Sequence, residues 1–98
     1  MFFITVFERP KNGGKLLLGT QRCWGFYFDL AIAVNAVKNN LTDLWETIYD
    51  YAVIEEIDQG ICFEAKQCQW YKFNTKTKKY ENIKKPGWAK GLCNFAIG

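Results

Sequence analysis

The sequence predicts an α+β domain in which one main helix packs on one face of an antiparallel sheet of about five strands, in the order ββαβββ. Two observations support this fold class. Strand-like stretches rich in aromatic and β-branched residues recur along the chain, and only one long stretch has helical spacing. The chain is long enough for a single domain, residues 1–98, and 49% of its residues are apolar, which suffices for one core.

Two strands are expected in the N-terminal part. Phe2–Glu8 places apolar side chains on both of its faces, which is typical of an interior strand with cover on both sides. The following segment contains Asn12 and Gly13, a dipeptide that favours hairpin turns. We therefore expect the chain to return as a second strand over Leu16–Arg22 and then to run through a link, Cys23–Phe28, that is rich in aromatic residues.

The helix is predicted to begin after Asp29, whose carboxylate suits the N-cap position. Apolar residues then recur at helical spacing, and two asparagines, which tolerate a left-handed backbone, follow to end the helix. A short helical turn is expected after them, over residues 42–46. The apolar stripe consists of Leu30, Ala33, Val34 and Val37, and the asparagines are Asn39 and Asn40.

Three further strands are expected after the helix. Ile48–Ile57 is rich in β-branched and aromatic residues, and Cys68–Phe73 and Lys79–Ile83 form a hairpin across a polar turn. In that hairpin we expect Phe73 to lie opposite Tyr80. Pro86 then ends the hairpin. The last two segments are a short helical turn and an extended piece, expected at Trp88–Leu92 and Cys93–Ile97.

Several kinds of catalytic chemistry are excluded by composition. The chain has no histidine and no serine, so neither Ser-His-Asp nor Cys-His nucleophile pairs are possible. Gly13–Lys15 lacks both the spacing and the following hydroxyl residue of a phosphate-binding loop. Glu55 and Glu56 are adjacent carboxylates, but neighbouring strand residues point to opposite faces. We therefore expect a protein that is not an enzyme and that needs no cofactor.

The cysteines and the N-terminus indicate where the protein works. The four cysteines, at positions 23, 62, 68 and 93, form no C-x-x-C pair, so we expect no metal site. The N-terminal residues lack the basic region of a signal peptide, and no apolar run reaches the roughly 18–20 residues of a membrane span. These observations favour a cytoplasmic protein with reduced thiols and no membrane partner.

Charge is distributed unevenly although the net charge is only +3. Residues 23–64 contain eight acids and one lysine, a balance of −7, whereas residues 65–98 contain eight lysines and one acid, a balance of +7. In the simplest interpretation the two parts complement each other, and the lysines protect an edge hairpin against aggregation. The alternative is a basic surface that meets an anion.

A small phosphorylated ligand fits this charge balance better than a nucleic acid. Only two of the thirteen basic residues are arginine, the side chain that reads guanine edges, and the eight acids of the middle segment would repel a long polyanion. Lysines would hold phosphates while an aromatic ring stacks on a base, although core packing is the commoner role of such rings. The candidate ligand-binding residues are Trp24, Tyr27, Trp70, Lys72, Lys85 and Trp88.

Three stretches resemble a group of small uncharacterised proteins that phages and mobile elements of low-GC bacteria encode: residues 48–55 followed by Gly60, residues 70–74 with Tyr80, and residues 94–98. The resemblance covers most of the chain, but its motifs look structural, so it implies no site residues. It implies a genomic setting in which small proteins inhibit bacterial defence systems in the cytoplasm of the host cell. Such a setting does not by itself fix a function.

Two classes of function are therefore expected. The first is a phage-type anti-defence protein, a homo-oligomer, that binds and sequesters a small nucleotide signal, such as a cyclic nucleotide or an ADP-ribose derivative. The second is a protein–protein inhibitor of a host defence effector, comparable to an anti-CRISPR, in which acidic residues mimic nucleic acid or aromatic residues form a hot spot. An interaction module without a defence role is a third possibility. The acidic residues concerned are Asp43, Glu46, Asp50, Glu55, Glu56 and Asp58.

Overall fold

The computed structural model describes residues 1–8, 21–41, 49–58, 67–91 and 95–96. The turns expected at 9–15 and 42–46 lie outside these residues. The described part contains five strands, one α-helix and one short 3-10 helix. These elements are β1 (Phe2–Glu8), β2 (Arg22–Tyr27), α1 (Leu30–Lys38), β3 (Tyr49–Glu56), β4 (Cys68–Asn74), β5 (Lys79–Ile83) and η2 (Gly87–Ala89).

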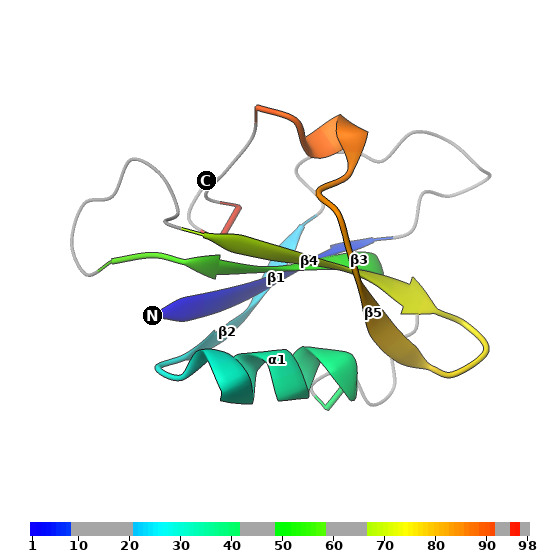
Figure 1. Cartoon of the computed structure of the whole chain (residues 1–98), viewed down its shortest axis with the longest axis horizontal. Coiled ribbons are helices and arrows are strands. Elements are labelled where there is room, and N and C mark those ends of the chain that lie inside the picture. Colours follow the sequence, from blue (N-terminus) through cyan, green and yellow to red (C-terminus); the bar gives the residue numbers. More distant parts are fainter. Residues whose placement is uncertain (9–20, 42–48, 59–66, 92–94, 97–98) are drawn as a thin grey trace.

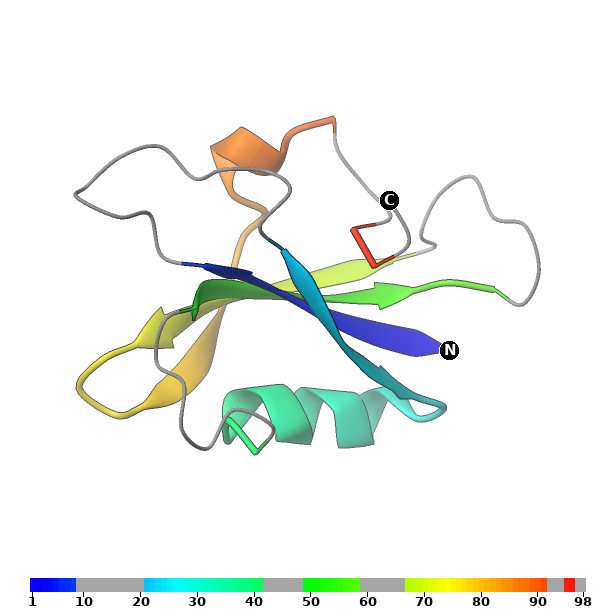
Figure 2. The same ribbon diagram turned by 180° about the vertical axis from the view of Figure 1, so that it is seen from behind.

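The five strands form one sheet in the order β2-β1-β3-β4-β5, and every neighbouring pair is antiparallel. α1 lies on one side of this sheet and η2 lies on the other, so the sheet is the middle layer of the molecule (Figures 1 and 2). The α+β fold and the element order ββαβββ are confirmed. β1 occupies an interior position, as its two apolar faces predict.

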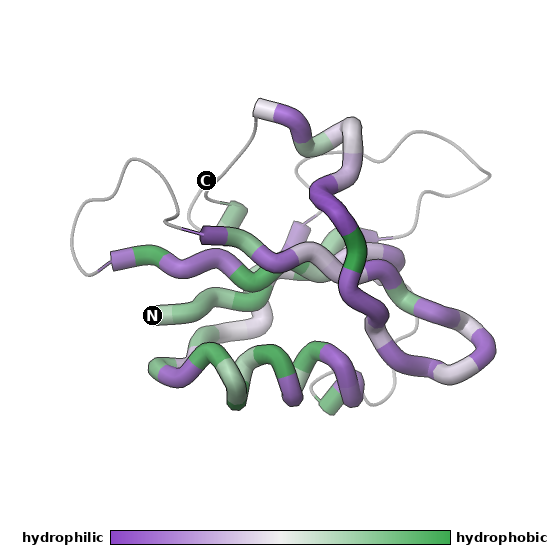
Figure 3. The backbone as a smooth tube through the Cα atoms, viewed as in Figure 1, coloured by the Kyte–Doolittle hydropathy of each residue, from purple (hydrophilic) through white to green (hydrophobic). Residues whose placement is uncertain are grey.

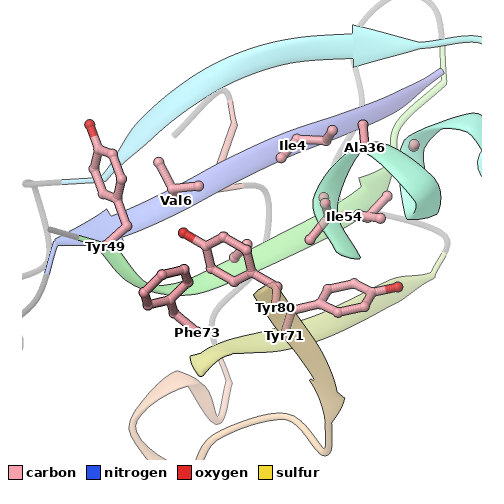
Figure 4. Packing of buried hydrophobic residues seen from close by; sticks show 11 residues of the cluster. Ile4, Val6, Ala36, Tyr49, Ile54, Tyr71, Phe73 and Tyr80 are labelled. Atoms are coloured by element: carbon pink, nitrogen blue, oxygen red, sulfur yellow. The ribbon is translucent and has the colours of Figure 1, made fainter. Parts of the chain in front are cut away.

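One core lies between α1 and the sheet, on what we call the α1 face (Figure 4). Alternate residues of β1, β3 and β4 point into it, because side chains of a strand alternate between its two faces. α1 contributes small side chains, which allow the helix to approach the strands closely. The buried residues of this core are Ile4, Val6, Ala33, Ala36, Val37, Tyr49, Ala52, Ile54, Tyr71, Phe73 and Tyr80.

A second core covers the opposite side of the sheet, which we call the aromatic face. The ring of Phe7 lies at its centre, with ring centroids of Trp88 and Phe95 5.1 Å away in edge-to-face arrangement and that of Trp70 5.7 Å away and stacked. Edge-to-face and offset-stacked pairs are the favourable geometries for aromatic rings. Its buried residues are Phe7, Val53, Trp70, Ala89 and Phe95.

The ends of α1 have the local signals that the sequence predicts. The Oδ1 atom of Asp29 accepts hydrogen bonds from the backbone N–H groups of Ala31 and Ile32, at 2.7 and 3.4 Å, so the N-cap is confirmed. Asn40 has a φ of 51°, in the left-handed region that ends helices. Between these residues, Ala33 and Val37 are fully buried against the sheet.

The second strand differs from its prediction. Residues 16–20 lie outside the described part, and the segment that was expected to be a link forms β2, paired with β1 from Arg22 to Tyr27. The register between the two strands shifts opposite Ile4 and Thr5, where β2 carries one extra residue. Gly25 there has a φ of 147°, which L side chains rarely adopt. The glycine therefore marks a β-bulge within a strand rather than a break between elements.

The hairpin of β4 and β5 is confirmed, with Phe73 opposite Tyr80 and their ring centroids 5.2 Å apart. The C-terminal segments differ from expectation. The helical turn occupies Gly87–Ala89, and Phe95 and Ala96 lie in a turn rather than an extended piece. Their two consecutive N–H groups donate to one carboxylate, which the alternating backbone of a strand does not allow.

Candidate functional site

A groove of about 610 Å³ opens at the β5 side of the sheet, between α1 and the β4–β5 hairpin. Four segments form its walls: the middle and end of α1, the beginning of β4, the end of β5 and the two lysines that follow β5. Because α1 packs against β5, these segments meet although they are distant in sequence. The lining residues with polar or charged side chains are Lys38, Gln69, Tyr71, Asn82, Lys84 and Lys85, together with Cys68.

The charge of this groove is positive. Lys38, Lys84 and Lys85 line it, and none of the described lining residues is acidic. All three lysines are exposed, so their ammonium groups remain hydrated and can reach a ligand. Figure 3 shows hydrophilic residues along β5 and the segment after it. Three lysines among lining residues that include no acid favour the binding of an anion, with an affinity that salt will weaken.

The inner wall of the groove is polar but neutral. Tyr71 is fully buried, and its hydroxyl donates to Oε1 of Gln69 at 2.8 Å. Burial raises the pKa of Tyr71 above its ordinary value, and a hydrogen bond with Asn82 partly opposes this change. Tyr71 therefore keeps its proton at neutral pH. Asn82 is exposed and donates from Nδ2 to the backbone oxygen of Trp70 at 3.2 Å, so amide groups of Gln69 and Asn82 are placed beside the lysines.

Two of the six residues predicted from the sequence belong to this groove. Lys85 is one of its lysines, and Trp70 also lines it. The ring of Trp70, however, is packed in the core of the aromatic face and is only 3% exposed. It is therefore not available to stack on a ligand, and its core role is the one the structure supports.

Trp24 and Tyr27 lie elsewhere, on β2. Together with Ile4 and Phe26 they line a smaller pocket of about 170 Å³. The ring of Trp24 makes edge-to-face contacts with Tyr49, at a centroid distance of 5.8 Å, which ties it to the core of the α1 face. Both residues are half-buried and pack against that core.

Lys72 and Trp88 lie on the aromatic face. The ammonium of Lys72 is 5.7 Å from the centroid of the Tyr51 ring, a cation–π geometry, and Lys72 faces Glu81 across the hairpin. Trp88 packs edge-to-face against Tyr51 with centroids 5.3 Å apart. The sheet thus separates these two residues from the side on which Tyr71 and α1 lie, and the six predicted residues do not converge on one site.

The list of candidate ligand-binding residues does not include five lining residues of this groove, which are Lys38, Gln69, Tyr71, Asn82 and Lys84. Part of the signal was available. Once Phe73 is placed opposite Tyr80, moving two residues along each strand places Tyr71 opposite Asn82 on the same face. The contribution of Lys38 had no such signal, because it depends on where the helix crosses the sheet.

The adjacent carboxylates Glu55 and Glu56 point to opposite faces, as predicted. Glu55 is fully buried on the aromatic face and accepts hydrogen bonds from the N–H groups of Phe95 and Ala96, both at 3.1 Å. Glu56 is half-buried and accepts from Nε2 of Gln67 at 2.9 Å. They therefore do not form a carboxylate pair for acid–base chemistry, and Glu55 has a structural role.

Comparisons of the chain with protein-family models, with curated proteins and with solved structures find no match. In the part of the chain that the structure describes, no helix is long and apolar enough to cross a membrane. The same residues contain no group of three or more cysteine, aspartate or glutamate side chains that could hold a metal ion. The groove beside β5 is therefore the feature on which a functional proposal rests.

Proposed function

We propose that the protein binds a small phosphorylated ligand of the nucleotide type in the groove between α1 and the β4–β5 hairpin, and that it holds this ligand without turning it over. The observation that carries the proposal is the set of three lysines around a groove of about 610 Å³ with no acidic lining residue among those described. This volume lies within the roughly 300–1,000 Å³ that is usual for small-molecule sites.

Recognition in this groove divides between charge and hydrogen bonding. Lys38, Lys84 and Lys85 bind the phosphates, and the amides of Gln69 and Asn82 donate to and accept from a base or a ribose. None of the described tryptophan rings is placed to stack there: the ring of Trp70 is packed on the other face, and Trp24 and Trp88 lie outside the groove. Phosphate contacts therefore supply most of the affinity, and binding weakens as salt is added.

The absence of turnover is supported by the residues that the chain lacks. It contains no histidine or serine. Tyr71 keeps its proton at neutral pH because burial raises its pKa, so it is a hydrogen-bond donor rather than a base. A protein that binds a nucleotide and returns it intact acts by sequestration, and the resemblance to phage and mobile-element proteins suggests a host defence signal as the ligand.

The competing hypothesis, an acidic surface that mimics nucleic acid for a defence effector, is less well supported. Glu55 is fully buried, so its carboxylate is not part of an acidic surface. Glu56 is half-buried and hydrogen-bonded to Gln67. Asp43 and Glu46 lie outside the described residues, Asp50 is half-buried, and of the described members of this set only Asp58 is exposed. The basic groove is therefore the better candidate.

A thermal-shift screen with linear nucleotides, cyclic nucleotides and ADP-ribose derivatives tests the proposal. A ligand at about a hundred times its Kd adds roughly 2.7 kcal/mol to the free energy of unfolding, which in a domain this small raises the melting temperature by on the order of 10 °C or more. The bound ligand should then be recovered chemically unchanged. A screen in which no phosphorylated ligand raises the melting temperature would overturn the proposal.

Matched lysine variants locate the site. Lys84→Ala and Lys85→Ala should each weaken binding roughly tenfold, the effect of losing about 1.4 kcal/mol from one charge-assisted contact. Lys72→Ala is the control, because Lys72 is an equally exposed lysine of the same hairpin region that lies on the aromatic face. Equal losses in all three variants would indicate non-specific attraction rather than a groove.

A further inference from the structure

The two edges of the sheet are protected very differently. β5 carries Lys79 and Glu81 and is followed by two lysines and Pro86, all of which discourage pairing with another chain. β2, at the opposite edge, ends in the aromatic residues Phe26 and Tyr27, and Phe28 follows directly. No described residue forms a strand on the outer side of β2.

The backbone groups of Phe26 point to the side of β2 that faces away from β1. Met1 and Ile57 exchange two hydrogen bonds: the N-terminal amine donates to the Ile57 oxygen at 3.2 Å, and the Ile57 N–H donates to the Met1 oxygen at 2.9 Å. These two bonds show that the N–H and C=O groups of Met1 point toward the β3 side. Backbone groups alternate sides along a strand, so those of Phe3, two residues later, also point toward β3. Phe26 lies opposite Phe3, so its own N–H and C=O point away from β1.

The side chains along this edge are apolar and exposed. Phe26 is 48% exposed and Phe28 is 80% exposed. The rings form a row, with centroids of Phe3 and Phe26 5.4 Å apart and those of Phe26 and Phe28 5.6 Å apart. Outward-pointing backbone groups beside an exposed aromatic row are what another strand needs for pairing.

We propose that a second copy of this chain pairs with β2, in an antiparallel arrangement with Phe26 opposite Phe26 of the second copy. A two-fold axis at this position joins the aromatic rows of the two copies, so each exposed ring meets an apolar partner. The proposal is independent of the ligand-binding groove, which lies at the other edge of the sheet.

Charge complementarity selects a second copy and this orientation. β2 begins at Arg22, and Asp29 follows shortly after its end. An antiparallel alignment brings Arg22 of each copy toward Asp29 of the other, whereas a parallel alignment would place like charges together.

Sedimentation velocity of the purified protein tests the interface. The wild-type protein should be a dimer in the micromolar range, and Phe28→Asp should shift it to the monomer, since an unpaired carboxylate would be buried in the interface. Phe26→Asp should have the same effect. Leu41→Asp is the control, because Leu41 is also an apolar residue, 51% exposed, located beyond the far end of α1, and its variant should remain a dimer.

Since Phe26→Asp could disturb the contact with Phe3, the decisive variant is Phe28→Asp, whose side chain is mostly exposed. Circular dichroism confirms that each variant is folded. A wild-type protein that stays monomeric throughout the micromolar range overturns the proposal. A folded Phe28→Asp variant that stays dimeric also overturns it.

The register is tested by cross-linking. Residues directly opposite each other in a hydrogen-bonded antiparallel pair have Cα atoms about 5.5 Å apart, within the range of a disulfide. In a background where the four native cysteines are replaced by alanine, Phe26→Cys should form covalent dimers on mild oxidation. Leu41→Cys in the same background should not. Cross-linking that is equally fast in both variants would contradict pairing through β2.

Discussion

The two faces of the sheet are covered by different kinds of structure. The α1 face is covered by a nine-residue helix that has its own cap and its own stripe of small apolar residues. The aromatic face is covered by the three-residue η2 and by Phe95 and Ala96, which Glu55 holds through two backbone hydrogen bonds. The helix on the α1 face is stabilised in part by its own cap and apolar residues, which are close together in the chain. The segments on the aromatic face are held by contacts between residues that are distant in sequence.

The consequence is a difference in sensitivity to mutation. Ring contacts on the aromatic face converge on Trp70, which touches Phe7, Trp88 and Phe95. On the α1 face the helix contributes Ala33, Ala36 and Val37, whose side chains are much smaller. We therefore expect single substitutions to be more damaging on the aromatic face. Four predictions test this comparison.

The largest effect is expected for Trp70→Ala. Removal of this buried ring should lower the free energy of unfolding by about 3–5 kcal/mol, because it leaves a cavity among aromatic rings. Val37→Ala, its counterpart on the α1 face, removes only two methyl groups and should cost roughly 1–2 kcal/mol. Urea unfolding of both variants measures the difference. Equal losses would contradict the predicted inequality between the two faces.

Glu55→Gln should come next, with a loss of about 1–3 kcal/mol. The amide can accept one of the two hydrogen bonds and brings an N–H group toward the N–H groups of Phe95 and Ala96. The near-UV circular dichroism of the aromatic rings should change while the far-UV spectrum is retained. Glu56→Gln is the control and should change stability by less than about 0.5 kcal/mol, since Glu56 is not buried. Similar losses in both variants would show that Glu55 does not anchor this cover.

Asp29→Ala should destabilise the α1 face by about 1 kcal/mol, because the N–H groups of Ala31 and Ile32 lose their acceptor. Asp29→Asn should restore most of this stability, since asparagine is an equally good N-cap. The Phe7 environment on the other side of the sheet should not change in either variant. Thermal unfolding and near-UV circular dichroism together measure these outcomes, and an Ala variant as stable as the wild type would contradict them.

The smallest effect concerns Tyr71 and pH. Burial raises its pKa above the ordinary value of 10.0, so the folded state holds the phenolic proton more tightly than the unfolded state. The resulting stabilisation is complete below about pH 10 and is lost as the pH rises through the raised pKa. Tyr71→Phe should flatten the fall of the unfolding free energy in this range. Identical pH profiles for the variant and the wild type would show that Tyr71 does not cause this pH dependence.

Some features of the candidate site could be predicted from the sequence and others could not. Lys85 was predicted because the lysine-rich end of the chain is visible in the sequence. The pairing of Tyr71 with Asn82 follows from the confirmed pair Phe73 and Tyr80, since register propagates along a hairpin. The expectation that tryptophans stack on a ligand could not be tested by composition, because a large aromatic ring suits a core and a binding site equally well.

By itself the sequence determined the elements whose signals are local. The Asp29 cap, the apolar spacing of α1, the two apolar faces of β1 and the turn between β4 and β5 each depend on residues close together in the chain. These interactions set backbone conformation before any distant contact forms.

Tertiary structure alone decided the rest. Only the pairing with β1 shows that Gly25 lies in a bulge of β2 rather than in a link. Only the packing of α1 against β5 brings Lys38 to Lys84 and Lys85, and only the fold places the N–H groups of Phe95 and Ala96 at Glu55. Each of these arrangements joins residues that are far apart in the chain. Such contacts stabilise the fold only once the chain has brought both segments together, which costs conformational entropy.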